Sequence, residues 1–413
     1  MKLDVVVVGA GAAGLLAALA AARGGRRVLV VEAARDVGRK ILVSGGGRCN
    51  VLPMEDAPQR FVSESPNRLV RRFLGRWPLS EQRAFFEELL GGPLREERES
   101  KKLFPPSNRA VDVRDALRFA VAAAGASLRA AAPVRDLAPV GDGFAVRLDG
   151  GEDILAPRVI LATGGRSVLA GGADAAGFTW AAAMGHRVHP TYPALVPLTG
   201  NAPAHHTLAG VSLPARVNAE SADDHATSRG GFLFTHKGWS GPAVLDVSHV
   251  VERARLAGRT AEVRVCFGGS QPGDAASQWD AALKGAAGAR SLSSFLSKSS
   301  LPDRLANLIL DVARVADVQL SYLSRDARAR VVEALTAFPL PATGTEGYRT
   351  AEVTGGGVAL EEVDAGSGRS RLVPGLFFAG EILDAFGPIG GFNFQWAWAT
   401  GRTAGEAAAR ARI

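Results

Sequence analysis

Cysteine is nearly absent from the sequence, with only Cys49 and Cys266 among 413 residues. Two cysteines cannot build a disulfide framework, and neither lies in a cluster with the spacing of a zinc site. We therefore expect no metal site and a reducing, cytoplasmic location. A redox-active dithiol is excluded too, because Cys49 has no second cysteine nearby. We expect Cys49 to be a buried packing thiol, against the alternative of a thiol activated by Arg48.

Clustered charge of one sign is also lacking. The net charge is +7 and the isoelectric point is near 9.8, but no run of five or more basic residues occurs. Scattered lysine and arginine predict a generally basic surface without a nucleic-acid patch. We expect a small-molecule partner, no nucleic acid and no membrane, and the oligomeric state stays open.

One long apolar run occurs, over residues 5–22. Asp4 precedes it, glycines interrupt it at fixed offsets, and a second apolar run, "RRVLVVE", follows. A signal peptide or a membrane span has none of these features. We interpret the run as a buried strand, a tight turn and a helix.

The segment "DVVVVGAGAAGLLAALAAARGGRRVLVVEA" has the pattern of a dinucleotide-binding unit. Gly9, Gly11 and Gly14 match the G-x-G-x-x-G spacing that permits a tight turn, backbone approach to a pyrophosphate, and close packing of helix on strand. The helix N-terminus faces the phosphates, and Glu32 ends the next strand, where it can accept hydrogen bonds from a ribose.

The rest of the chain favours FAD over NAD as the dinucleotide. Further glycine-rich strand ends occur far from the first, at "RVILATGGRS" and at "GLFFAGEILDAFGPIGGFNFQWAWATG". A helix expected from about Phe392 would direct its N-terminal amides at the flavin pyrimidine ring. Such a discontinuous pattern is typical of flavoproteins that assemble one site from both ends of the chain.

Longer motifs add a resemblance to a known family. "GRKILVSGGGRCN", "YPALVPL", "GGFLFTHKGWSGPAVLDVS", "TGGGVALEEVD" and the "GLFFAGEILDAFG" segment resemble the BaiN/YhiN-type family of NAD(P)/FAD-dependent oxidoreductases. Its members are described as aminoacetone oxidase-like and as 3-dehydro-bile-acid reductase-like. The resemblance implies an α/β fold, in which a glutathione-reductase-like FAD-binding Rossmann domain is interrupted by an insert domain.

The insert itself has signals of its own. Glycine-rich nucleotide motifs vanish from it, short strand candidates appear, and residues 279–283, 292–296, 302–313 and 325–338 have helical spacing of apolar residues. We expect a β-rich insert with a small helical part at residues 191–345, between the N-terminal part (1–190) and the C-terminal part (346–413) of the FAD domain.

Three consecutive glycines predict a loop over "GRKILVSGGGRCN", and the family resemblance implies that this segment passes the flavin. The resemblance places Arg39 and Lys40 near the phosphates or the ribityl chain, with a solvated turn as the alternative. The glycines let backbone amides approach the ring. In all, the sequence predicts noncovalent FAD binding by Gly9, Gly11, Ala12, Ala13, Gly14, Glu32, Ala33, Arg39, Lys40, Ser44, Gly45, Gly46, Gly47, Asn50, Val134, Thr163, Gly164, Gly165, Gly380, Glu381, Gly391, Phe392 and Asn393.

Catalytic residues are not identified by the sequence. His236, Tyr192 and Arg109 are candidates, each with a structural alternative. We expect hydride transfer through FAD to an activated double bond of a small molecule, with NAD(P)H as a transient donor. Because no second G-x-G-x-x-G occurs, an amine oxidase that uses dioxygen is an alternative. A basic, RNA-associated flavoprotein is a second one.

Overall fold

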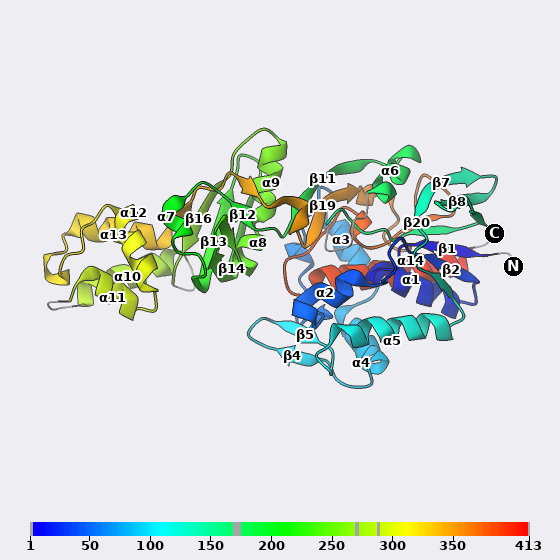
Figure 1. The fold of residues 1–413 in the computed structure, drawn as a ribbon, viewed down its shortest axis with the longest axis horizontal. Helices are drawn as coiled ribbons and strands as arrows, with labels where there is room; N and C mark the ends of the chain where they lie inside the picture. The colour runs from blue at the N-terminus through cyan, green and yellow to red at the C-terminus, as the bar shows by residue number, and fades with distance from the viewer. Residues whose placement is uncertain (1–2, 168–174, 269–271, 287–289, 412–413) are drawn as a thin grey trace. The chain divides into compact units, whose positions relative to one another are not determined.

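The computed structural model describes residues 3–167, 175–268, 272–286 and 290–411. The chain forms two compact units. The first unit comprises Met1–Pro193 and Glu352–Ile413, and the second comprises Ala194–Ala351. Both ends of the chain, blue and red in Figure 1, therefore belong to one unit.

A five-stranded parallel sheet forms the centre of the first unit, in the order β20-β10-β1-β2-β6. Its strands are β1 (Val5–Val8), β2 (Val28–Val31), β6 (Ser127–Arg129), β10 (Val159–Leu161) and β20 (Leu376–Phe378). All residues of β1, β2, β10 and β20 are buried, as expected of parallel strands covered on both faces. The sheet confirms the predicted Rossmann fold, and β20 brings the C-terminal part of the chain into it.

Helix α1 (Ala12–Arg23) lies directly against α14 (Phe392–Arg410), from the opposite end of the chain (Figure 1). Glycines in α14 permit this contact. A Cβ on Gly401 would lie 2.3 Å from the Ala13 oxygen, and one on Gly405 would lie 2.2 Å from the Ala17 oxygen. The two termini are thus joined by backbone-to-backbone packing.

The other elements of the first unit form three small sheets, with the orders β3-β5-β4, β7-β8-β9 and β11-β19, and further helices. They are α2 (Arg39–Gly47), β3 (Leu52–Pro53), α3 (Asn67–Leu74), α4 (Leu79–Leu89), β4 (Arg95–Glu97), β5 (Lys102–Phe104), α5 (Ala110–Ala123), β7 (Val134–Val140), β8 (Gly143–Leu148), β9 (Asp153–Ala156), α6 (Ala176–Ala183), β11 (Val188–Ala194) and β19 (Val353–Val358).

Helix α2 corrects the expectation of a loop over "GRKILVSGGG". Residues 39–43 are helical and bury Ile41, which the glycine content of the segment conceals. The helix is interrupted at Ser44 (ψ 148°), and Gly45 and Gly46 have φ of 58° and 67°. The expected backbone freedom is therefore confined to the second half of the segment.

The second unit is built on a seven-stranded antiparallel sheet of order β17-β16-β13-β14-β15-β12-β18. The strands are β12 (Leu198–Thr199), β13 (Ser212–Glu220), β14 (His225–Phe234), β15 (Gly238–Ser240), β16 (Glu262–Cys266), β17 (Phe338–Leu340) and β18 (Gly344–Thr345). The helices are α7 (Pro203–His206), α8 (Pro242–Leu245), α9 (Ser248–Leu256), α10 (Pro272–Gly285), α11 (Leu292–Lys298), α12 (Asp303–Ala313) and α13 (Arg325–Thr336). The antiparallel sheet confirms the predicted β insert, and these helices make its helical part larger than predicted.

One helix boundary in this unit was wrong. The helix expected to reach residue 338 ends at Thr336, and Phe338 instead begins β17, where it pairs with Val265 of β16. Phe338 is fully buried in the core of the unit. Because a buried apolar residue occurs in helices and strands alike, the sequence pattern could not tell which of the two contains Phe338. In the described ranges, no helix has both the length and the hydropathy needed to span a bilayer.

Candidate functional site

The turn between β1 and α1 is packed on two sides and open on the third. A Cβ on Gly9 would lie 2.4 Å from the Ala162 oxygen, and one on Gly14 would lie 1.9 Å from the Gly9 oxygen. In contrast, a Cβ on Gly11 would meet no atom within 4 Å. Gly11 is the N-cap residue of α1, and no side chain forms a capping hydrogen bond with the first amides of the helix. Open space in front of uncapped amides fits a phosphate group of a dinucleotide.

Glu32 lies beside this turn. Its carboxylate accepts hydrogen bonds from the amides of Ala10 (2.7 Å) and Ala34 (2.9 Å). The backbone of Ala131 and Ala132 bonds to the same corner, through the oxygens of Ala34 and Glu32. The structure therefore brings Glu32 and Ala33 next to the chain that leads into β7 at Val134. A fixed carboxylate at this corner fits a ribose-hydroxyl acceptor.

The glycine segment of α2 lies over Asn50. A Cβ on Gly45 would be 2.7 Å from Asn50 Oδ1 and 3.1 Å from the Phe104 ring. Asn50 Oδ1 is buried and has no hydrogen-bond partner among the described residues. A buried acceptor without a donor is costly, and a flavin ring N–H would satisfy it. Ser44, by contrast, uses its hydroxyl to bond the Ile41 oxygen (3.0 Å).

Lys40 and Glu381, which are 341 positions apart, form an ion pair. The other oxygen of Glu381 accepts a hydrogen bond from the Thr354 amide at 2.9 Å. A Cβ on Gly165 would lie 2.4 Å from that same oxygen. Arg39, the neighbour of Lys40, is exposed. Segments from α2, the end of β10, β19 and the end of β20 thus meet at one carboxylate.

Thr354 is a site residue that sequence reasoning missed. Its amide binds Glu381 and its hydroxyl accepts the Arg166 amide at 2.7 Å, so it joins β19 to the turn after β10. The signal is the "TGGGV" segment, in which the glycines attract notice and the threonine does not.

The ends of β10 and β20 both contact the first glycine turn. Gly380 (φ 80°) approaches Ala13 so closely that a Cβ would lie 2.7 Å from the Ala13 side chain. The Gly380 amide donates to Thr400, and its oxygen accepts the indole N–H of Trp396 (3.0 Å). Thr163 and Gly164 follow β10, and the Thr163 Cα would lie 3.2 Å from a Cβ on Gly9. These contacts bring Thr163 and Gly380, two of the predicted residues, to the start of α1.

The start of α14 is the last part of the site. Gly391 has a φ of 97°, and a Cβ there would lie 2.5 Å from the Leu52 backbone. No side chain caps the helix. Asn393 exchanges two hydrogen bonds of 2.9 Å with the Gly387 backbone, and Phe392 packs edge-on against Phe61. Asn393 thus holds the loop before the helix, and the uncapped N-terminus fits an electron-rich ring edge of the flavin.

The three catalytic candidates lie on separate elements. Tyr192 is buried, and its ring occupies the space that a Cβ on Gly355 would need. His236 is exposed between β14 and β15 in the second unit, and Arg109 is exposed just before α5. Cys49 is fully buried, and burial raises the pKa of its thiol to about 12. A thiol in that state is a packing group and does not act as a nucleophile.

The described ranges contain no group of three or more His, Cys, Asp or Glu side chains that could hold a metal ion. The first unit offers open space at the start of α1, a fixed carboxylate at Glu32 and an uncapped start of α14, which fit the phosphates, the ribose and the ring of FAD. This fold and site define an FAD-dependent oxidoreductase.

The chain belongs to the HI0933-like family, whose Rossmann-domain model matches residues 3–407. The ribosomal RNA dihydrouridine synthase of Escherichia coli (strain K12) is 33% identical over 404 residues, which is 97% of this chain and 96% of that protein. The 3-dehydro-bile acid delta(4,6)-reductase of Clostridium scindens is 32% identical over 410 residues, 98% of either protein. The resemblance drawn from the motifs is thereby confirmed.

Among solved structures, a 3-ketosteroid-Δ4-(5α)-dehydrogenase from Rhodococcus jostii RHA1 matches with a TM-score of 0.51 and 14% identity. The match covers 99% of this chain and 97% of that chain. At this level of identity the similarity concerns the fold alone.

Proposed function

We propose that the protein is a reductase that adds hydrogen across a carbon–carbon double bond conjugated to a carbonyl group, with NAD(P)H as the donor. One observation carries the proposal: the two relatives that match almost the whole chain are named for reductions of this kind. A dihydrouridine is a uridine that is reduced at a ring double bond next to a carbonyl, and a delta(4,6)-reductase acts on double bonds of a ring system.

The reaction adds one hydride and one proton to the substrate and oxidises NAD(P)H to NAD(P)+. Bound FAD would supply the relay for the hydride. The chain's own residues would bind and orient it. The amides at Gly11 would hold the pyrophosphate, Glu32 the ribose, and Asn50 with the start of α14 the ring. The ion pair of Lys40 and Glu381 would fix the segments around it.

The substrate class has two candidates. A small apolar carbonyl compound is the first, in line with the bile-acid reductase relative. A uracil ring in RNA is the second, which the dihydrouridine synthase relative favours. A cytoplasmic location belongs to the same proposal, and the two free cysteines support it.

The experiment tests the oxidative half of the reaction. Holoenzyme is reduced with dithionite without oxygen and then offered, separately, a steroid enone, an unmodified ribosomal RNA transcript, and dioxygen. The proposal expects the flavin absorbance to return fastest with one of the two conjugated acceptors. Return with dioxygen alone would contradict it and favour the amine-oxidase alternative.

A further inference from the structure

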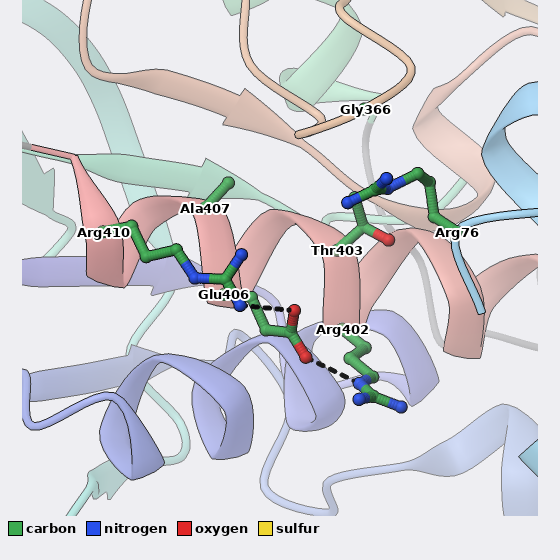
Figure 2. Close-up of a pocket in the computed structure, with 7 residues that line it drawn as sticks. All are labelled: Arg76, Gly366, Arg402, Thr403, Glu406, Ala407 and Arg410. Carbon is green, nitrogen blue, oxygen red and sulfur yellow. Dashed lines mark hydrogen bonds and ion pairs between the residues drawn. The ribbon is translucent and has the colours of Figure 1, made fainter. Parts of the chain in front are cut away.

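The second half of α14 carries a small polar pocket. It lies toward the C-terminal end of the helix, whereas the candidate flavin site lies at its N-terminal end. The pocket has a volume of about 30 Å³, and residues from three segments line it (Figure 2). Its lining residues are Arg76, Gly366, Arg402, Thr403, Glu406, Ala407 and Arg410. Arg76 follows α3, Gly366 lies in the loop before β20, and the others belong to the second half of α14.

The pocket has an excess of positive charge. Three guanidinium groups line it, and Glu406 is the one carboxylate in its lining. Glu406 accepts from Arg402 at 2.7 Å and from Arg410 at 3.2 Å, one helical turn to either side, as Figure 2 shows. This carboxylate orients two arginines but neutralises only one charge, so two positive charges remain uncompensated within the lining.

The guanidinium of Arg402 stacks on the ring of Trp77. Its guanidinium lies 4.6 Å from the centre of the Trp77 ring, and Trp77 is itself fully buried. A cation stacked on a buried indole loses little further freedom when it binds an anion. The Thr403 hydroxyl adds a neutral hydrogen-bond donor beside it.

Positive charge continues from the pocket onto α3. Arg68, Arg71 and Arg72 are exposed on this helix, and no acidic residue occurs from Pro66 to Trp77. Helix α3 packs against α14, and Arg72 lies near enough to Asp364, in the loop that carries Gly366, for the two charges to interact. The carboxylate of Asp364 lies beside Gly366 and pairs with Arg371 at 3.5 Å, so this loop adds one negative charge at the edge of the pocket. The sequence hides this cluster because its members come from two ends of the chain.

We propose that the pocket formed by Arg76, Arg402 and Arg410 binds a phosphate group of single-stranded RNA, and that the arginines of α3 contact the neighbouring phosphates. The planar guanidinium fork matches a phosphate in a bidentate way, and a row of arginines matches a repeating backbone charge. The inference rests on the RNA candidate of the proposed function and gives that candidate a docking surface.

The test measures binding of a fluorescein-labelled, mixed-sequence RNA oligonucleotide to FAD-loaded protein by anisotropy across a salt series. The variant is Arg76→Ala/Arg410→Ala, which removes two exposed side chains. The matched control is Arg118→Ala/Arg135→Ala, two exposed arginines of α5 and β7. Inorganic phosphate serves as the competitor in a second series.

We expect the pocket variant to bind about tenfold more weakly than wild type at ~0.1 M salt, with a log–log salt slope shallower by about 0.7, because the pocket contacts one phosphate and each phosphate contact to a single strand contributes ~0.7. The control should bind as wild type does. Equal binding by wild type and the pocket variant overturns the proposal, and so does a wild type that binds inorganic phosphate but not RNA. Flavin bleaching by NAD(P)H, measured on the same samples, reports separately on the reductase activity.

Discussion

At the scale of single residues, three glycines of one motif act in three different ways. Gly9 and Gly14 are required because backbone oxygens occupy the place of a side chain, whereas nothing occupies that place at Gly11. The backbone of Gly11, with a φ of −77°, is one that any residue can adopt. The need for glycine at Gly11 therefore comes from the ligand and not from the fold.

This difference predicts opposite results for two substitutions. Gly11→Val should leave the free energy of unfolding of the FAD-free protein within about 0.5 kcal/mol of wild type. The same substitution should abolish the retention of FAD through purification. Gly14→Ala should destabilise the FAD-free protein by more than about 2 kcal/mol, because its Cβ overlaps the Gly9 oxygen. Urea unfolding and flavin absorbance report the two effects. A Gly11→Val protein that retains FAD would place the pyrophosphate elsewhere.

The buried thiols predict a lack of reactivity. With its pKa at about 12, Cys49 is about one part in ten thousand thiolate at pH 8, and burial also raises the pKa of Cys266. Native protein should therefore react slowly with Ellman's reagent, and guanidinium-unfolded protein should release two equivalents at once. One fast equivalent in native protein that disappears in Cys49→Ala would show an activated thiol.

At the scale of elements, the sequence predicts regular, strongly patterned segments well. The β1–α1–β2 unit, the strand at β20 and the helix from Phe392 all follow from apolar runs between glycines. Helix α2 could not be predicted in this way, because its glycines suggest a loop while the burial of Ile41 decides for a helix. The predicted end of α13 was wrong because the apolar pattern does not distinguish a helix from a strand at Phe338. Only its pairing with β16 identifies this residue as part of a strand.

A buried histidine in the second unit, His205, leads us to expect that the stability of the fold depends on pH. His205 is buried among Phe234, Trp239 and Phe338, and burial, aided by the charge of His206, lowers its pKa from 6.5 to about 4. The unfolded chain therefore binds a proton more readily than the folded one. The stability from this histidine is present above pH 6.5 and is lost as pH falls toward 4.

Between pH 7 and pH 5 this group should cost the fold about 2 kcal/mol. His205→Phe should reduce the pH dependence by that amount, and His225→Phe, at an exposed position of β14, should leave it unchanged. The measurement is the free energy of unfolding in urea at the two pH values. An undiminished pH dependence in His205→Phe would mean that His205 is solvated.

At the scale of the whole molecule, the flavin site depends on chain ends that sequence order keeps apart. The glycine motifs predict that both ends take part, but they cannot predict that Lys40 bonds Glu381 or that Asn50 Oδ1 is buried without a donor in the described part of the chain. Such pairings depend on three-dimensional packing between distant segments. The arginines of α3 and α14 illustrate the same limit, because scattered charges in the sequence converge in the fold.

Because the site joins both ends of the chain, FAD should stabilise the first unit as a whole. Free FAD at a hundredfold excess over its dissociation constant should add about 2.7 kcal/mol to the free energy of unfolding. Differential scanning fluorimetry of FAD-free protein with added FAD, and with riboflavin as the control, measures this. A riboflavin effect as large as that of FAD would show that the pyrophosphate cradle at α1 contributes nothing.

The most direct measurement is an anaerobic absorbance titration of the purified protein with NADH and with NADPH, after the bound flavin has been identified by its release on denaturation. The account predicts an oxidised-flavin spectrum, release of intact FAD, and bleaching by one of the two nucleotides. A colourless protein that does not take up added FAD would contradict the central claim, and an FAD spectrum that neither nucleotide bleaches would contradict the proposed donor.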